Sequence, residues 1–118
     1  TIVLDGGEPV LALGSPGGSM IITTVLQTLL NRTDFGMTLP DALAAPRASQ
    51  RNTAAVFAEP AFIAAWGAAL SALGHTFTTT TEIGAVTAIE FLEDGTLLAA
   101  AEPVRRGGGD AGVVSPRR

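Results

Sequence analysis

The order of apolar and polar positions predicts a chain that mixes strands and helices. Two almost wholly apolar runs, residues 1–4 and 9–13, flank Asp5-Gly6-Gly7-Glu8, and this arrangement predicts a β-hairpin. Because neither run has polar residues at alternate positions, we expect its strands to be covered on both faces. Further short strands are predicted at residues 54–59, 76–81, 85–92 and 96–101, the last two joined by a turn at Asp94-Gly95.

Longer apolar periodicity predicts helices between these strands. Within residues 21–30, Ile22, Leu26 and Leu30 recur four positions apart, so we expect the apolar face of the helix to pack on a sheet. Ile21, Val25 and Leu29 lie beside them on this face, and the other side carries Thr23, Thr24, Gln27 and Thr28. Ser19 is predicted to be the N-cap of this helix. Two more helices are predicted, a short one at residues 39–45 with Thr38 and Asp41 as a capping box, and one at residues 61–73 that stops at Gly74.

The chain of 118 residues is long enough for one domain with its own core. We therefore predict a single domain over residues 1–118, with hairpins and helices mixed in an α+β architecture rather than a doubly wound parallel sheet. The glycine-rich composition predicts a flexible tail over residues 107–118, in which Val113-Val114 could add a final edge strand.

The most informative stretch is Gly14-Ser15-Pro16-Gly17-Gly18-Ser19, called the glycine loop below. It lies between an apolar strand and the first long helix, and its glycines let the backbone approach another group closely. At a helix start the backbone N–H groups have no partner within the helix, so they suit an anion. Three interpretations follow: a site for a bound phosphate or carboxylate, an oxyanion hole for acyl transfer, or a plain turn without a ligand.

Other catalytic motifs fit poorly. The glycine loop lacks the Gly-Lys-Ser/Thr of a P-loop and the Gly-x-Gly-x-x-Gly spacing of a dinucleotide fold. Residues 17–21 come near a nucleophile elbow but have Ile21 where its second glycine belongs. A serine hydrolase would need His75 as its base, and this sole histidine directly follows the helix-ending Gly74, so we expect it to be non-catalytic. One histidine and scattered acidic residues predict no metal site.

Composition narrows the classes of partner. The formal net charge is −4 and all seven basic residues are arginine, without a basic stripe that could follow a phosphate backbone, so nucleic acid is not an expected partner. The pairs Arg105-Arg106 and Arg117-Arg118 are expected to be solvated near the C-terminus. The absence of cysteine excludes disulfides and thiol nucleophiles. No apolar run reaches the length of a membrane span.

Taken together, the motifs along the chain resemble those of a known family, the γ-glutamyltranspeptidases of the N-terminal-nucleophile hydrolase superfamily. The resemblance is to the C-terminal part of the small subunit and runs through nearly the whole chain. Its motifs are, in order, residues 10–27 with the glycine loop and Ile21-Ile22-Thr23-Thr24, then Asp34-Phe35-Gly36-Met37, Asp41-Ala42, Ala45-Pro46-Arg47 and Leu73-Gly74-His75. The chain departs from the family at Ala48-Ser49-Gln50-Arg51 and at Glu102-Pro103-Val104-Arg105-Arg106, which replaces an Asp-Pro-Arg pattern.

The resemblance implies an αββα sandwich that cleaves itself to expose a threonine, which attacks a γ-glutamyl carbonyl and forms an acyl-enzyme. Gly17 and Gly18 would supply the backbone N–H groups of the oxyanion hole, with Ser15, Pro16 and Ser19 as substrate-binding neighbours. No cofactor or metal is expected. Substrates would be γ-glutamyl small molecules such as glutathione-like amides, and many bacterial members of the family are periplasmic or secreted.

The family nucleophile would not lie in this chain. Thr1 starts the strand that leads to the glycine loop, whereas the family threonine opens a Thr-Thr-His-like motif well upstream. We therefore expect a fragment of a γ-glutamyltranspeptidase-like enzyme, inactive alone, whose partners are the large subunit and the rest of the small subunit. Its uncovered apolar strands would favour self-association. The alternative is a non-catalytic α+β domain that binds an anion at the glycine loop or packs on a partner chain.

Overall fold

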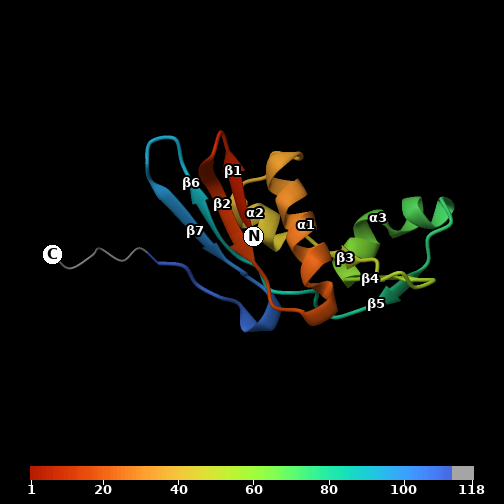
Figure 1. The fold of residues 1–118 in the computed structure, drawn as a ribbon. Coiled ribbons are helices and arrows are strands. Elements are labelled where there is room, and N and C mark those ends of the chain that lie inside the picture. The colour runs from red at the N-terminus through yellow and green to blue at the C-terminus, as the bar shows by residue number, and fades with distance from the viewer. Residues whose placement is uncertain (113–118) are drawn as a thin grey trace.

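The computed structural model describes residues 1–112 and contains a four-stranded antiparallel sheet with helices on one face (Figure 1). The strand order is β1-β2-β6-β7, with bounds Ile2–Asp5, Glu8–Gly14, Thr87–Phe91 and Leu97–Ala101. Both predicted hairpins are confirmed, since β1 pairs with β2 and β6 pairs with β7. In the second hairpin the turn is held by Asp94, whose Oδ1 accepts the Thr96 N–H at 2.9 Å.

Helices α1 (Ile21–Thr33) and α2 (Leu39–Ala44) cover one face of this sheet. Thr38 caps α2 as predicted, because its Oγ1 accepts the Asp41 N–H at 3.3 Å. The apolar core fills the space between helices and sheet and consists of Leu11, Leu13, Leu39, Leu43, Val86, Ala88 and Ala100. The predicted α+β class is confirmed, and a sheet with helices on one face corresponds to one half of an αββα sandwich.

A second, smaller sheet lies beside the first. It has the order β3-β4-β5, with bounds Ala48–Ser49, Val56–Ala58 and Phe77–Thr79. Strands β4 and β5 are parallel because α3 (Pro60–Ala72) forms the crossover between them. The segment at which the chain departs from the family motifs thus begins as β3, whose Ala48 N–H donates to Gln27 Oε1 of α1 at 3.2 Å.

The packing face predicted for α1 is right for Val25 and Leu29, which pack against the core, and wrong for Ile22 and Leu26. The side chains of Thr24 and Thr28 are buried against the rest of the chain, whereas Ile22 is 77% exposed and Leu26 51% exposed. Threonines are small enough to let the helix lie close to its neighbours, and Thr28 Oγ1 donates to the Thr24 carbonyl oxygen at 2.9 Å, so its burial leaves no lost hydrogen bond. The part of the predicted apolar face formed by Ile22 and Leu26 therefore faces outward.

The predicted N-cap at Ser19 is also wrong. A 3₁₀ turn, η1 (Gly18–Met20), precedes α1, and Met20 occupies the N-cap position without a side-chain hydrogen bond. The turn forms because Gly17 adopts φ +146°, which redirects the chain so that the Met20 N–H donates to the Gly17 carbonyl oxygen at 3.1 Å. Ser19 lies inside this turn with an exposed side chain.

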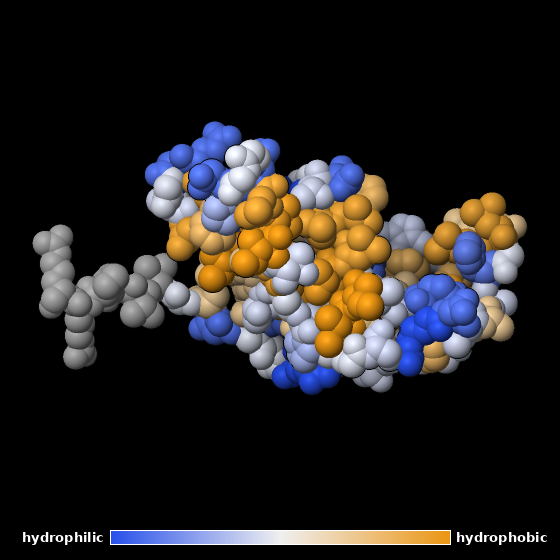
Figure 2. All heavy atoms as spheres, viewed as in Figure 1, coloured by the Kyte–Doolittle hydropathy of each residue, from blue (hydrophilic) through white to orange (hydrophobic). Residues whose placement is uncertain are grey.

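Apolar side chains gather over α1 and the edge strand β1 on one face of the molecule (Figure 2). In β1, Ile2 is 69% and Leu4 59% exposed, so within residues 1–112 these strands are not covered on both faces. The chain then folds back after β7 through a second 3₁₀ turn, η2 (Arg105–Gly107), and the Gly109 N–H donates to the Glu102 carbonyl oxygen at 2.6 Å. Val113, Val114, Arg117 and Arg118 lie outside the described residues. No helix of residues 1–112 is long and apolar enough to cross a membrane.

Candidate functional site

The glycine loop connects the end of β2 to the start of α1, as the sequence predicts. Its backbone turns at two successive residues with positive φ, +146° at Gly17 and +57° at Gly18. Positive φ is costly for residues with a side chain, which explains a glycine at both positions. Gly18 is exposed, and neither its N–H nor that of Gly17 donates a hydrogen bond to an acceptor within residues 1–112. The loop thus presents two unpartnered N–H groups near the start of a helix.

Residues 83–85 support this loop from the side. A methyl group on Gly17 would lie 3.5 Å from Gly84 Cα, so the two backbones lie close together with room for no more than a methyl group between them. A methyl group on Gly84 would lie 2.6 Å from Ser15 Oγ and 2.7 Å from the methyl carbon of Thr24. Gly84 itself has φ +65°, so both space and backbone conformation exclude a side chain there.

The predicted substrate-binding neighbours of the loop differ in placement. Ser15 Oγ accepts the Ala85 N–H at 3.0 Å and donates to the Pro16 carbonyl oxygen at 2.7 Å, so this hydroxyl serves the loop itself. Pro16 and Ser19 are exposed beside Gly18 and remain predicted neighbours of a substrate.

Thr1 and His75 lie outside this arrangement. The Thr1 α-amino group donates to the Leu13 carbonyl oxygen at 2.9 Å, and the Leu13 N–H donates back to Thr1, which is strand pairing as predicted. His75 is exposed and follows α3, whose C-terminal end lies far from the β2–α1 connection (Figure 1). Within residues 1–112 no group of three or more histidine or acidic side chains could hold a metal ion.

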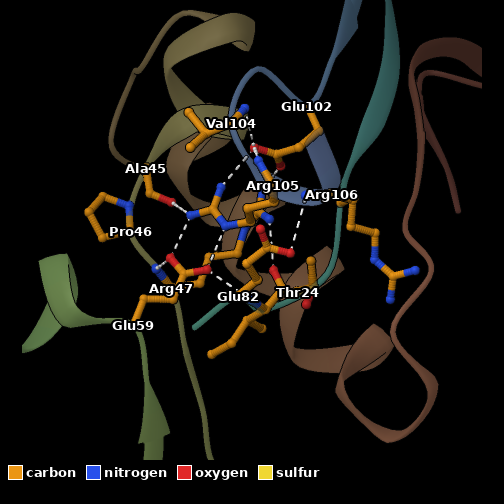
Figure 3. A network of polar contacts seen from close by, with 12 residues as sticks. Thr24, Ala45, Pro46, Arg47, Glu59, Glu82, Glu102, Val104, Arg105 and Arg106 are labelled. Atoms are coloured by element: carbon orange, nitrogen blue, oxygen red, sulfur yellow. Dashed lines mark hydrogen bonds and ion pairs between the residues drawn. The ribbon is translucent and has the colours of Figure 1, made fainter. Parts of the chain in front are cut away.

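Behind residues 83–85 lies a buried network of four charged side chains, Arg47, Glu59, Glu102 and Arg105 (Figure 3). Arg105 donates two hydrogen bonds to Glu59, from Nε to Oε1 at 2.5 Å and from Nη2 to Oε2 at 2.6 Å. Its Nη1 also donates to Glu102 Oε1 at 3.0 Å, and Arg47 Nη2 donates to Glu102 Oε2 at 3.0 Å. Two positive and two negative charges compensate each other in this network, which is necessary for charges removed from water.

The network also shifts the pKa values of its members. Burial alone would raise the pKa of Glu59, but the hydrogen bonds from Arg105 and from the Arg47 and Ile83 N–H groups outweigh burial and hold this pKa below its ordinary value. The pKa of Glu102 is lowered in the same way, with Arg47 and Arg105 together outweighing the effect of burial. Both carboxylates are thus held in their charged form by the arginines.

The expectation that Arg105-Arg106 forms a solvated pair is wrong for Arg105. Arg105 is 5% exposed because the turn η2 directs its side chain inward, whereas Arg106 is exposed. The sequence predicts no role for Arg47 or Glu102 and predicts Glu59 only at a strand end. Glu102 and Arg105 are three residues apart, but their partners Arg47 and Glu59 lie far along the chain, so no local signal brings the four together.

The whole described part of the chain, residues 1–112, matches the family model for gamma-glutamyltranspeptidase. The chain belongs to the γ-glutamyltranspeptidase family. The resemblance predicted from the sequence motifs is thereby confirmed.

Individual relatives agree with the family match. The chain is 36% identical to the glutathione hydrolase proenzyme of Bacillus subtilis over 109 residues, which is 91% of this chain and 19% of the relative. The solved γ-glutamyltranspeptidase of Pseudomonas nitroreducens in complex with L-DON superposes with a TM-score of 0.78 at 29% identity, covering 98% of this chain and 61% of the solved chain. The cephalosporin acylase of Bacillus halodurans gives a TM-score of 0.79 at 28% identity, covering 86% and 20% of the respective chains. The chain therefore spans about a fifth of the curated proenzyme it matches.

The buried network predicts opposite results at two neighbouring arginines. Replacing Arg105 by Met leaves Glu59 and Glu102 undercompensated in the interior and should lower the free energy of unfolding by about 3–5 kcal/mol. Arg106→Met, at an exposed side chain, should change it by less than about 0.5 kcal/mol. Urea denaturation of both variants in the full-length protein measures the difference, and equal effects would contradict the assigned burial.

Stability should also depend on pH in the acid range. Glu59 and Glu102 have lowered pKa values in the folded state, so they bind protons more readily when unfolded. Their stabilising contribution is complete above the ordinary pKa of 4.5 and is lost as the pH falls through the lowered values. The melting temperature should therefore fall on acidification below about pH 4.5. A melting temperature unchanged from pH 6 to pH 3 would show that these carboxylates are not stabilised.

Proposed function

We propose that this chain is the C-terminal part of a γ-glutamyltransferase or hydrolase small subunit and supplies its oxyanion hole. The observation that carries the proposal is the pair of unpartnered N–H groups at Gly17 and Gly18, at the end of a strand and beside a helix start. Family membership supports an acyl-transfer reaction, since its relatives include glutathione hydrolases. A site of free, pre-oriented donors is suited to a negative charge that develops during reaction.

In the proposed reaction the nucleophile is a threonine hydroxyl outside this chain. Its oxygen attacks the γ-glutamyl carbonyl carbon, the carbonyl oxygen becomes an oxyanion, and the Gly17 and Gly18 N–H groups donate to it. The α-amino group of that threonine takes the hydroxyl proton and passes it to the leaving amine as the C–N bond breaks. An acyl-enzyme remains, which water hydrolyses or an amino acid accepts. Two donors held in place before the reaction lower the barrier because they need no rearrangement as the charge forms.

The remainder of the enzyme is the proposed partner of the exposed apolar surfaces. The outward stripe of α1, with Ile22 and Leu26, and the exposed face of β1 would be covered by the large subunit and the rest of the small subunit. In an isolated chain the same surfaces would instead promote self-association.

A second candidate substrate class comes from the acylase relatives. The cephalosporin acylase superposes on 86% of the present chain. The same loop could therefore serve the hydrolysis of another amide. An oxyanion hole recognises the carbonyl and not the acyl group, so the loop alone does not select between these substrate classes. Parallel assays of the full-length protein on a γ-glutamyl anilide and on a cephalosporin side-chain amide distinguish them.

Gly17→Ala tests the oxyanion hole. The added methyl group has ordinary space but forces an L residue to φ +146°, so the loop should shift and turnover in the full-length enzyme should fall by about 10²–10³, the typical loss on removing one oxyanion donor. Affinity for a tetrahedral γ-glutamyl phosphonate should fall in parallel, whereas the KM should change little. Gly18→Ala changes the second proposed donor at φ +57° with open space around the added methyl group, so its turnover should fall less than that of Gly17→Ala. Near-normal turnover in a folded, self-cleaved Gly17→Ala enzyme would favour the non-catalytic anion-binding alternative.

His75→Gln should leave catalysis nearly intact. His75 is exposed after α3, and the proposed mechanism assigns it no proton to transfer. Turnover of the full-length variant should fall far less than the roughly 10²–10⁴-fold expected on losing a general base. A loss of that size with an unchanged melting temperature would place His75 in the chemistry.

A further inference from the structure

Both polar groups of the Ile83 peptide are held by the buried charges. The Ile83 N–H donates to Glu59 Oε1 at 2.9 Å, and Arg47 Nη1 donates to the Ile83 carbonyl oxygen at 2.9 Å. Glu59 Oε2 in turn accepts the backbone N–H of Arg47 at 2.9 Å, so the two charged residues are tied to each other as well. Ile83 is fully buried, and its position is therefore set by charged side chains that cannot move without losing several hydrogen bonds.

The next two residues transmit this position to the glycine loop. Gly84 packs against Gly17 and Ser15 without a side chain between them, and the Ala85 N–H donates to Ser15 Oγ. Ile83 thus contacts Arg47 and Glu59, and Gly84 lies against the backbone of the glycine loop. Ala85 contacts the Ser15 hydroxyl. A shift of Ile83 displaces the support on which Gly17 lies.

We propose that Arg47 and Glu59 are positioning residues for the oxyanion hole and act through residues 83–85. This inference rests on the proposed function of Gly17 and Gly18. Arg105 also contributes to this positioning, because its two hydrogen bonds to Glu59 fix the carboxylate that accepts the Ile83 N–H. Catalytic donors lose effect when displaced by a fraction of an ångström, so a remote buried pair can control turnover without touching substrate.

The test is Arg47→Lys in the full-length enzyme. Lysine keeps the positive charge, but one ammonium group cannot serve the three acceptors of Arg47, which are the Ile83 and Leu43 carbonyl oxygens and Glu102 Oε2. We expect kcat on a γ-glutamyl amide to fall about tenfold to hundredfold while the KM changes less than about twofold, because the donors act in the transition state. Hydrogen–deuterium exchange should rise in peptides that cover residues 14–20 and 82–86.

The chain offers a matched control in Arg32→Lys. Arg32 pairs with Glu90 between α1 and β6, is partly exposed, and has no hydrogen bond to residues 83–85 within the described chain. This variant should leave both kcat and exchange at residues 14–20 unchanged. A second check combines Arg47→Lys with Ser15→Ala, which removes the acceptor of the Ala85 N–H. If both act through residues 83–85, the double variant should lose less activity than the product of the single losses.

The outcomes separate the inference from the proposed function. Unchanged kcat per folded molecule, a kcat loss without faster exchange at residues 14–20, or a double variant whose losses multiply would each overturn the positioning role. If Gly17→Ala retains turnover, the oxyanion function fails, and faster exchange at residues 14–20 in Arg47→Lys would then establish only that the pair holds the loop. A purely structural role predicts a lower melting temperature with kcat unchanged.

Discussion

The hydrogen bonds that hold the Ile83 peptide join the two halves of this structure. The apolar core lies only between the four-stranded sheet and the helices α1 and α2, and it does not extend to the small sheet. The connection to the small sheet is made by polar and charged groups. Gln27 of α1 accepts the Ala48 N–H of β3, and in the charged network Arg47 precedes β3, Glu59 follows β4, and Glu102 and Arg105 follow β7. Such a network is costly to bury and contributes less than an apolar core of equal size. It does, however, demand one geometry, because each guanidinium must meet several acceptors at once.

This demand also accounts for the orientation of α1. Thr24 contacts Gly84 closely, so the helix can approach residues 83–85 only with small side chains on its inner face. A leucine at that position would separate the helix from residues 83–85. The most buried positions of the helix are therefore Thr24 and Thr28, Val25 and Leu29 pack against the core beside them, and Ile22 and Leu26 are left on the outer face. The hydroxyl of Thr24 and the Nε of Arg47 have no hydrogen-bond partner within residues 1–112.

The sequence predicted the elements well and the packing poorly. Glycine and Asp-Gly turns identify both hairpins, and Thr38 identifies the start of α2, because these are local signals. The glycine loop was also found locally, from glycines that the backbone conformation requires. Periodicity alone misplaces Ile22 and Leu26 of α1, since it assumes that the most apolar face is the buried one. The charged network is not predictable because Glu59 and Arg105 are 46 residues apart, and the local pair of Glu102 with Arg105 does not by itself indicate burial.

The same reasoning explains why the support of the candidate site is distant in sequence. A loop built from glycines has few side chains of its own, so its packing cannot determine its conformation. Gly17 has φ +146° and Gly18 has φ +57°. Glycine adopts other backbone conformations almost as readily, so nothing in these residues themselves keeps them at these angles. Their geometry must be imposed by neighbours, and the neighbours here are another glycine backbone, at Gly84, and a hydroxyl, at Ser15. Backbone against backbone leaves no side chain to absorb a shift, so the rigidity of this loop depends on what holds residues 83–85 from behind.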